Sequence, residues 1–428
     1  MQETDYKQRQ QNLLELTGQQ PAIIRSHDLQ TRSHDTEYPY RQRSSFSYLL
    51  GFNEHDSLLV VTPRKTTLFL REKDEFLELW MGKMLGTQKA LDILDIDESF
   101  DIKELSNKLP DLVDDFEDIY FDFSDQKLKT EVEKAMSNLM SKRKKKTKSP
   151  SGMKDLYDYV GTLRLTKDDN EKLRMQKSAQ IACLAHRAAM ASTNNSRNEK
   201  DIENLMEFIF KREGGSGAAY GSIIAGGENA LCLHYIENNS DFKDGDLVLI
   251  DAGAEFQGYA SDITRTFPVN GKFTPAQKEV YQIVLDAQES AIKMANNGKT
   301  LTDLHDETCR VLKEGIEKLG IKGELKTYYP HGTSHWIGLD VHDQCPYKDK
   351  NNETIKLAPG MSFTVEPGLY FPVNDNNVPE KYRGIGIRIE DDIIMTEQGA
   401  QNLTASVPKT ISEVEKACSE DPAQFLFL

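Results

Sequence analysis

The chain has 428 residues, more than one compact core usually supports, so two domains are expected. Its 53 basic and 69 acidic residues give a formal net charge of −16, which argues against nucleic acid or an anionic membrane as a partner because both would be repelled. No apolar stretch approaches the roughly 20 residues of a membrane span and the N-terminus lacks a signal-peptide pattern, so a soluble, cytoplasmic protein is expected.

The cysteines are five in number and widely spaced, and none forms a Cys-x-x-Cys pair. An odd count without such pairs predicts neither a disulfide framework nor a zinc site built from thiolates. This cysteine usage fits the reducing cytosol.

The first part of the chain has the pattern of a small α/β domain. Short apolar runs separated by turn residues predict strands at Phe46–Leu50, Ser57–Val61, Thr67–Leu70 and Asp118–Phe123. Helical spacing predicts helices over residues 76–85 and 131–140. A basic stretch, Lys142–Lys148, precedes Ser149-Pro-Ser-Gly and predicts an exposed loop close to a linker. We therefore place the two domains at residues 1–155 and 156–428.

The second part predicts an antiparallel sheet covered by helices, which is an α+β domain. Apolar residues at helical spacing predict helices at Asp168–Ser192, Lys200–Arg212, Pro275–Asn296 and Leu301–Leu319. Strands are predicted at Asp246–Ile250, Tyr259–Phe267, Met361–Val365 and Ile385–Ile394. The glycine-rich run Gly214–Gly217 fits no phosphate-binding spacing and predicts a mobile loop.

The segment from Asp246 to Phe267 is interpreted as a hairpin, because two apolar strands flank a glycine-containing turn. With the turn at Phe256 and Gln257, Asp251 lies directly opposite Asp262, with Cβ atoms about 5 Å apart on one face. Two carboxylates that close repel, and one keeps its proton unless a cation lies between them. The hairpin alone, however, favours the simpler interpretation of two aspartates that flank a turn.

Further candidate ligands follow in the sequence. Three of the chain's nine histidines fall within twelve residues, at His331, His335 and His342. A core histidine is usually solitary. Glu366 ends a predicted strand, which Pro367 stops. In residues 384–392 the alternation of side chains places the isoleucines on one face and Arg388 with Glu390 on the other.

Together these segments supply four carboxylates and one imidazole, from Asp251, Asp262, His335, Glu366 and Glu390. Four negative charges match two divalent ions, and oxygen-rich ligands suit hard or borderline ions such as Mn²⁺ or Co²⁺. Two ions about 3.5 to 4 Å apart can share a bridging water and polarise a peptide carbonyl. The constellation predicts a hydrolase.

With these residues the sequence closely resembles aminopeptidase P, the proline-specific branch of the pita-bread metallopeptidases, which also include prolidase, methionine aminopeptidase and creatinase. The resemblance extends from Glu37-Tyr-Pro-Tyr-Arg-Gln to Asn402-Leu-Thr-Ala-Ser. It implies a creatinase-like, ribonuclease-H-like α/β N-terminal domain and an α+β pita-bread catalytic domain. It also implies Xaa-Pro peptides as substrates, two Mn²⁺ ions as cofactors and a homodimer or homotetramer.

The resemblance assigns all five residues named above as metal ligands, with Asp262 and Glu390 bridging the two ions. It assigns substrate binding and transition-state support to His234, His331, His342 and Arg388. Without the resemblance, His234 would be interpreted as an ordinary sheet histidine and Arg388 as a partner of Glu390.

The resemblance reaches weaker motifs as well. Arg164 aligns with an active-site arginine of the family, and Asp35 and Trp80 fall where family tetramers extend into a neighbouring active site. One departure follows His342-Asp343, where this chain has Gln344-Cys345 and the family usually has Val-Gly. We expect this departure to affect the pocket wall beside His342.

A peptide bond before proline lacks an N–H and carries a ring, so a dedicated site is expected. The expected mechanism is attack by a metal-bridging hydroxide, with Glu366 carrying the proton to the proline nitrogen and His342 and His234 stabilising the oxyanion. Prolidase, which accepts only dipeptides, is the alternative; His331-Gly-Thr-Ser-His-Trp favours aminopeptidase P. A non-catalytic module of the same fold is disfavoured because all five ligands are present.

Overall fold

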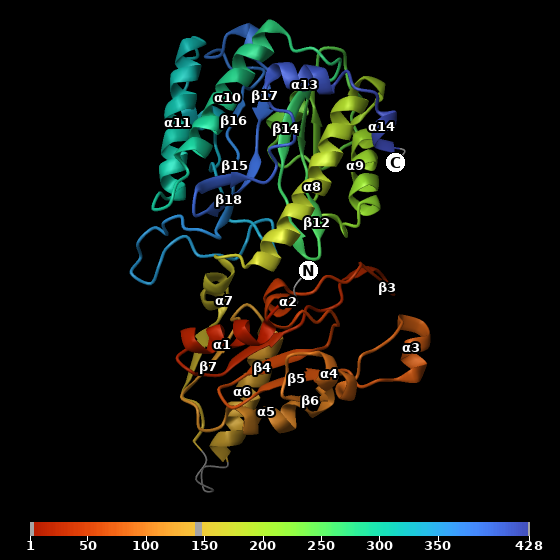
Figure 1. The fold of residues 1–428 in the computed structure, drawn as a ribbon, viewed down its shortest axis with the longest axis vertical. Coiled ribbons are helices and arrows are strands. Elements are labelled where there is room, and N and C mark those ends of the chain that lie inside the picture. The colour runs from red at the N-terminus through yellow and green to blue at the C-terminus, as the bar shows by residue number, and fades with distance from the viewer. Residues whose placement is uncertain (1–3, 142–147, 427–428) are drawn as a thin grey trace. The chain divides into compact units, whose positions relative to one another are not determined.

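The structure is a computed structural model that describes residues 4–141 and 148–426. The greater part of the predicted basic loop, residues 142–147, lies outside the described residues. The chain divides into two compact units, Met1–Arg164 and Leu165–Leu428, drawn in Figure 1 in red to yellow and in yellow to blue. The sequence-based domain boundary after residue 155 stays a prediction.

The first unit is built on a six-stranded mixed sheet with the strand order β6-β5-β4-β1-β7-β8. Its strands are β1 (Ala22–Arg25), β4 (Leu58–Val61), β5 (Thr66–Leu70), β6 (Glu98–Asp101), β7 (Asp118–Phe121) and β8 (Gly152–Asp155), and a separate hairpin consists of β2 (Thr31–Ser33) and β3 (Thr36–Glu37). Because β8 pairs with β7, the chain returns to this sheet after the basic stretch. The basic stretch is therefore not the linker between the units.

Helices surround this sheet. They are α1 (Tyr6–Leu16), α2 (Ser44–Leu50), α3 (Glu75–Met81), α4 (Thr87–Ile93), α5 (Leu105–Val113), α6 (Gln126–Ser141) and α7 (Tyr157–Arg164). Apolar side chains of α5 and α6, among them Leu109 and Val132, share a buried cluster with Ile23, Val60 and Phe69 of the sheet. Burial of this continuous apolar face is what holds the sheet and the two helices together.

The predicted strand at Phe46–Leu50 is wrong, because these residues form helix α2. A short apolar run with aromatic residues fits a buried helix as well as a buried strand. The helix ends at Gly51, whose φ of 68° is left-handed and favours glycine. Phe46 and Leu49 are fully buried, so tertiary packing decided between the two possibilities.

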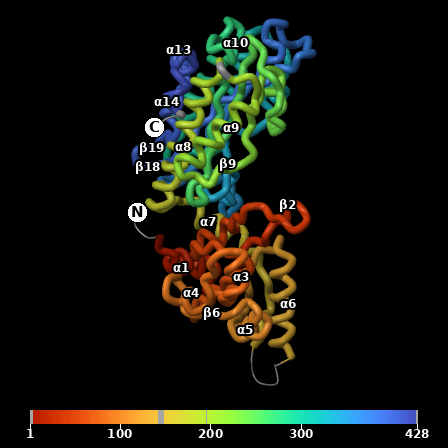
Figure 2. The backbone as a smooth tube through the Cα atoms, turned by 90° about the vertical axis from the view of Figure 1, so that its right-hand side faces the viewer, coloured from red at the N-terminus to blue at the C-terminus, as the bar shows by residue number. Residues whose placement is uncertain are grey.

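The second unit contains the four long helices that the sequence predicted. They are α8 (Asp169–Ser192), α9 (Glu199–Arg212), α10 (Pro275–Met294) and α11 (Leu301–Lys318), with shorter helices α12 (Leu325–Tyr328), α13 (Ile411–Ala417) and α14 (Ala423–Leu426). Capping boxes open α8, α10 and α11, and begin at Asp168, Thr274 and Thr300. In Figures 1 and 2, α8 and α9 lie side by side, and Figure 1 shows α10 and α11 on the other side of the strands.

The strands of the second unit pair only with antiparallel neighbours in the described residues, as predicted. The paired groups are β10-β11-β14, β13-β12-β9, β15-β18-β19 and β16-β17. Their bounds are β9 (Gly217–Ala218), β10 (Ile223–Gly226), β11 (Leu247–Asp251), β12 (Ala254–Phe256), β13 (Tyr259–Ala260), β14 (Thr264–Pro268), β15 (Ser362–Val365), β16 (Gly368–Tyr370), β17 (Gly386–Arg388), β18 (Asp391–Thr396) and β19 (Gly399–Asn402). The predicted glycine loop is shorter than expected, because Gly217 already belongs to β9.

The predicted hairpin forms, but its register is two residues from the predicted one. Phe256 pairs with Tyr259, so the turn lies at Gln257 and Gly258, whose φ values of 50° and 84° are left-handed as in a type I′ turn. Asp251 is therefore opposite Thr264 and not opposite Asp262. Because the shift is even, both aspartates stay on the same face of the hairpin.

Among the helices of the described residues, none is both long enough and apolar enough to cross a membrane.

Candidate metal centre and its cavity

Asp251 and Asp262 come from the two arms of the hairpin and approach the same tyrosine. Asp251 is the last residue of β11, and Asp262 lies between β13 and β14. The hydroxyl of Tyr220 lies 2.7 Å from Oδ1 of Asp251 and also contacts Oδ1 of Asp262. A hydroxyl carries one proton and satisfies one of these oxygens at a time. Arg388 binds the other oxygen of Asp251 at 2.6 Å, so Asp251 has an arginine partner of its own.

The close approach of the two strands requires a glycine. Gly253 lies between β11 and β12, and a Cβ atom at this position would collide with the carbonyl oxygen of Ser261. Ser261 directly precedes Asp262 in the chain. A larger residue at position 253 would therefore push Ser261 away and move the following Asp262 away from Asp251 on β11.

His335 presents one ring nitrogen to the carboxylates. Its Nδ1 lies 3.1 Å from the carbonyl oxygen of Trp336, and a carbonyl only accepts, so Nδ1 carries the proton. Nε2 lies 3.4 Å from Oδ2 of Asp262 and 3.7 Å from Oε1 of Glu366. Burial lowers the pKa of His335, but the two carboxylates outweigh it and raise the pKa to about 9. An imidazole fixed through Nδ1 in this way is the usual form of a metal-binding histidine.

Glu390 completes a group with metal-ligand spacing. It lies between β17 and β18, where its N–H donates to the carbonyl of Thr264 at 3.0 Å and its Oε2 accepts from the hydroxyl of Thr264 at 2.6 Å. One ligand atom from each of Asp262, His335 and Glu390 lies within 4.8 Å of the other two. Metal–oxygen and metal–nitrogen bonds are about 2.0 to 2.6 Å long, so one cation between these atoms can reach all three.

The buried acids are in electrostatic conflict. Burial raises the pKa of Glu366 to about 7, and burial together with Asp251 raises the pKa of Asp262. The pKa of Glu390 lies well above its ordinary value, because of burial and the neighbouring Asp262 and Glu366. Burial would also raise the pKa of Asp251, but Arg388 outweighs it and lowers the pKa. Such a cluster must either keep protons or bind cations, so its residues fit a metal site.

The five predicted ligands share one cavity of about 240 Å³. Its lining residues are Leu233, His234, Asp251, Asp262, His331, His335, His342, Glu366, Arg388 and Glu390. The tertiary structure thus brings together the predicted ligands and the four residues predicted to bind substrate or support the transition state. All of them belong to the second unit.

A chain of hydrogen bonds fixes Arg388 and His331 in the wall of the cavity. Arg388 donates to the hydroxyl of Tyr370 at 2.8 Å, and this hydroxyl lies 2.9 Å from Nε2 of His331. Nδ1 of His331 donates to the carbonyl of Gly332 at 2.8 Å, so Nε2 accepts from Tyr370. Burial lowers the pKa of His331 to about 4. His331 is therefore neutral at pH 7, and both of its nitrogens are occupied.

His234 and His342 differ from His331 in this respect. Within residues 4–141 and 148–426, no hydrogen bond to either imidazole ring is present. The ring of His342 meets the ring of His335 edge to face, with 4.3 Å between centroids. Burial, His335 and His234 lower the pKa of His342. A neutral imidazole offers one donor and one acceptor, so His342 has both available for a ligand.

The residues after His342 do not form the cavity wall. Cys345 is buried in an apolar cluster with Trp336 and Phe363, and neither Gln344 nor Cys345 lines the cavity. The expected effect of this departure on the wall is therefore not seen.

Three predicted substrate residues belong to the first unit. Arg164 is buried at the end of α7, and Asp35 is exposed in the turn between β2 and β3. Trp80 lies on α3 with 75% of its surface exposed. Their roles stay predictions.

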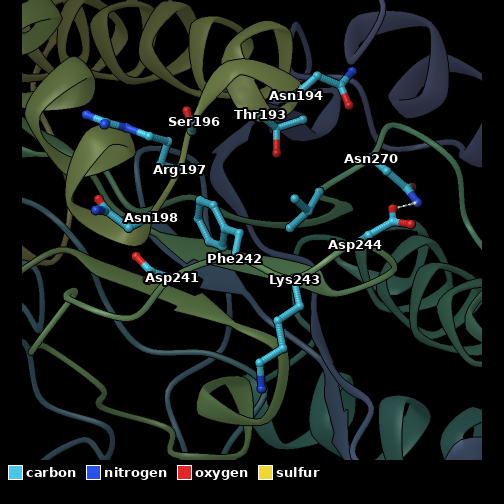
Figure 3. Close-up of a pocket in the computed structure, with 11 residues that line it drawn as sticks. Thr193, Asn194, Ser196, Arg197, Asn198, Asp241, Phe242, Lys243, Asp244 and Asn270 are labelled. Carbon is cyan, nitrogen blue, oxygen red and sulfur yellow. Dashed lines mark hydrogen bonds between the residues drawn. The ribbon is translucent and has the colours of Figure 1, made fainter.

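The second unit has a larger hollow of about 790 Å³ between the α8–α9 connection and the segments at 241–244 and 269–270. Figure 3 shows Phe242 near its centre and the hydrogen bond from Asn270 to Asp244, which is 2.7 Å long. Its lining contains no histidine, glutamate or cysteine. We therefore place the chemistry in the smaller cavity, where acids and an imidazole converge.

Sequence reasoning missed three residues that hold the side chains of the site, namely Tyr220 and Thr264, which contact predicted metal ligands, and Tyr370, which contacts Arg388 and His331. Tyr220 follows the glycine-rich run, and β9 brings it to the site by pairing with β12. Thr264 lies close in sequence to Asp262, and this closeness to a predicted ligand is the signal that could have identified it. No local pattern marks Tyr370, whose contacts with Arg388 and His331 are made across the fold.

The antiparallel strands, the flanking pairs of long helices and the buried acid-rich cavity define a metal-dependent hydrolase of the pita-bread class. Comparison with known proteins agrees. Residues 173–397 match metallopeptidase family M24, and residues 6–120 match the N-terminal domain of aminopeptidase P.

Individual relatives extend over nearly the whole chain. The Xaa-Pro aminopeptidase of Escherichia coli strain K12 is 39% identical over 432 residues, with 96% of each chain covered. The structure of Pseudomonas aeruginosa aminopeptidase PepP has a TM-score of 0.93 at 36% identity and covers 98% of both chains. A zinc-substituted E. coli aminopeptidase P in complex with product has a TM-score of 0.92 at 39% identity, with 97% of both chains covered. The chain belongs to the aminopeptidase P branch of metallopeptidase family M24, and it is an Xaa-Pro aminopeptidase.

Proposed function

We propose that Asp251, Asp262, His335, Glu366 and Glu390 hold two divalent metal ions, and that these ions are Mn²⁺. The observation that carries the proposal is the convergence of four carboxylates and one imidazole on one buried cavity. Four negative charges balance two divalent cations, and oxygen-rich ligation suits hard or borderline ions. When bound, the ions supply Lewis acidity and lower the pKa of water.

Glu366 is the proton carrier of this proposal. Its carboxyl group is largely enclosed beside the other acids of the cavity, and a carboxyl group positioned in this way can accept and donate a proton. It lies at the end of β15 and faces the same cavity as Asp262 and Glu390. We assign to it the transfer of a proton to the proline nitrogen that leaves.

His342 and His234 act on the substrate side of the cavity. Their ring nitrogens have no protein partner within the described ranges, whereas both nitrogens of His331 do. We therefore assign the oxyanion to His342, assisted by His234, and a fixed wall position to His331 and Arg388. The α-amino group of the peptide binds beside the carboxylates, which limits cleavage to the first bond.

A manganese-dependent assay tests the metal assignment and the preference for longer peptides. The metal-free enzyme is compared with the enzyme supplied with Mn²⁺, Co²⁺ or Zn²⁺, on an Xaa-Pro-Xaa peptide and on the matching Xaa-Pro dipeptide. We expect the highest kcat/KM with Mn²⁺, two bound ions per chain and faster cleavage of the longer peptide. One bound ion per chain, or greater activity with another metal, would contradict the metal assignment.

We also propose that the protein works as a homodimer or homotetramer in the cytoplasm. Helix α3 buries none of its residues, and it exposes Phe76 at 70%, Leu79 at 79% and Trp80 at 75%. Such an apolar surface is usually covered by a partner. Arg164 and, from a neighbouring subunit, Asp35 and Trp80 would then contact substrate. The five free cysteines suit a reducing compartment. Sedimentation of the W80A variant tests the assembly, which should dissociate.

A further inference from the structure

Glu199 is a fully buried carboxylate outside the metal cavity. It is the first residue of α9 and has 0% exposed surface. Oε1 accepts from the N–H of Gly226 and from the side chain of Asn229, and Oε2 accepts from the hydroxyl of Tyr235 and the N–H of Ser240. Each of the four distances is 2.8 Å. In the part of the chain that the structure describes, no cationic side chain pairs with it.

The four groups that contact the Glu199 side chain all donate hydrogen bonds, so the residue at this position must accept them. A carboxylate has about four acceptor positions, and the four donors fill them. A buried carboxylate is costly unless such hydrogen bonds compensate it, and bonds to a charged acceptor are stronger than neutral ones. A glutamine at this position would turn an NH₂ group towards two of the donors and leave them without a partner.

One donor, Gly226, is the last residue of β10, and the other three belong to the connection of residues 227–246 that leads from β10 to β11. This connection carries Leu233 and His234, which both line the metal cavity. Tyr235, whose hydroxyl binds Glu199, is the next residue after His234. The connection contains one 3₁₀ turn, Gly227–Leu231, and no strand, so its path depends on such side-chain bonds.

The imidazole of His234 has no bond of its own to hold it. Its ring makes no hydrogen bond in the structure across the described ranges. We propose that Glu199 is a positioning residue for His234, and that it acts through its hydrogen bonds to Tyr235 and to Gly226 and Ser240 on either side of His234. This inference rests on the role proposed above for His234.

The same connection has other ties that keep it folded without Glu199. Asn238 accepts from the N–H of Ile224 at 2.9 Å and donates to the carbonyl of Ser222 at 2.8 Å. The N–H of Phe242 donates to the carbonyl of Arg197 at 3.0 Å. A variant of Glu199 is therefore expected to fold, with the connection displaced.

The experiment is a double-mutant cycle in the metal-loaded full-length enzyme. The single variants are E199Q, Y235F and H234A, and the double variants are E199Q/H234A and Y235F/H234A. The matched control is E207Q on the same helix, because Glu207 is paired with Lys211 on the surface. For each protein, kcat, KM, bound metal and the thermal midpoint are measured with an Xaa-Pro-Xaa peptide.

We expect E199Q and Y235F to lower kcat by about 10- to 100-fold, with bound metal unchanged, because a displaced group costs on this order. In the H234A background the same substitutions should have no further effect on kcat. E207Q should match the wild type. The Y235F cycle keeps the carboxylate and serves if E199Q fails to fold.

Two outcomes would overturn the inference, and they are distinguishable. If H234A has the wild-type kcat, the role proposed for His234 fails, and the positioning role fails with it. If H234A is impaired but E199Q or Y235F lowers kcat by the same factor in both backgrounds, His234 keeps its role and Glu199 acts only on general stability.

Discussion

Arg265 of β14 and Asp391 of β18 form an ion pair that solvent does not reach, with Nη2 2.6 Å from Oδ1 and both side chains 0% exposed. Nη1 of Arg265 also donates to the carbonyl oxygens of Thr264 and Glu390. The pair therefore holds the backbone of a predicted metal ligand and of the threonine that binds it. Buried charge of this kind is tolerated because each group has several hydrogen-bond partners.

Replacing Arg265 by methionine should destabilise the protein strongly. The change leaves Asp391 as a buried charge that has lost its main partner, and such changes cost about 3–5 kcal/mol. Urea denaturation of the metal-loaded enzyme measures the free energy of unfolding. The matched control is R310M, since Arg310 forms ion pairs with Glu307 and Glu314 on the surface of α11, where they contribute little. An equal loss in both variants would contradict the role of burial.

Metal binding should strengthen as pH rises. The pKa of Glu366 is raised to about 7 by burial, and the pKa of His335 is raised to about 9 by Asp262 and Glu366 despite burial. Both groups bind more protons in the folded chain than in the unfolded chain, so their contribution to the stability of the metal-free fold is lost as pH rises, between about 4.5 and 7 for Glu366 and between about 6.5 and 9 for His335. A metal ion takes the place of these protons.

The increase in thermal midpoint on adding Mn²⁺ should therefore be larger at pH 8 than at pH 6. Calorimetric titrations in two buffers with different ionisation enthalpies should detect protons released on binding, and the number released should fall as pH rises. An increase in thermal midpoint that does not depend on pH, or metal binding without proton release, would contradict the raised pKa values of Glu366 and His335.

Replacing Glu366 by glutamine should abolish turnover. Glutamine keeps the shape of the side chain but neither carries the proton nor provides a carboxylate ligand. We expect less than about a tenth of the wild-type kcat/KM. Bound metal is measured in the same samples, because a loss of activity with both ions retained isolates the proton transfer. An enzyme that keeps more activity than this would contradict the proton route.

Replacing Tyr220 by phenylalanine should weaken metal binding without unfolding the protein. The hydroxyl of Tyr220 contacts both Asp251 and Asp262, and groups that orient metal ligands typically contribute 10- to 100-fold in affinity, by order of magnitude. Competition with a chelator measures the affinity. Y382F is the control, since Tyr382 binds Glu279 away from the cavity. If Y220F binds the metal as tightly as the wild type, the hydroxyl of Tyr220 is not needed to orient the two aspartates.

Several features of the fold could be predicted because they depend on neighbours in the sequence. The periods of α8 and α10 follow from apolar spacing, and the alternation around Arg388 and Glu390 places both in the cavity while Ile387 and Ile389 enter the core. These patterns repeat every few residues along one helix or one strand, so they can be detected in the sequence. The resemblance to the aminopeptidase P family made it possible to predict the set of metal ligands and the activity as well.

Other features depend on contacts between distant segments. The type I′ turn at Gln257 and Gly258 decided the register of Asp251, and the burial of most side chains of Ser44–Leu50 favoured a helix there. Tyr220 reaches the aspartates only because β9 joins β12. In the same way, only the tertiary structure places Glu199 against the connection that carries His234. The sequence by itself determined which residue types are available and which face each one takes; their convergence was decided by packing, because hydrogen bonds and burial between remote segments leave no periodic trace in the chain.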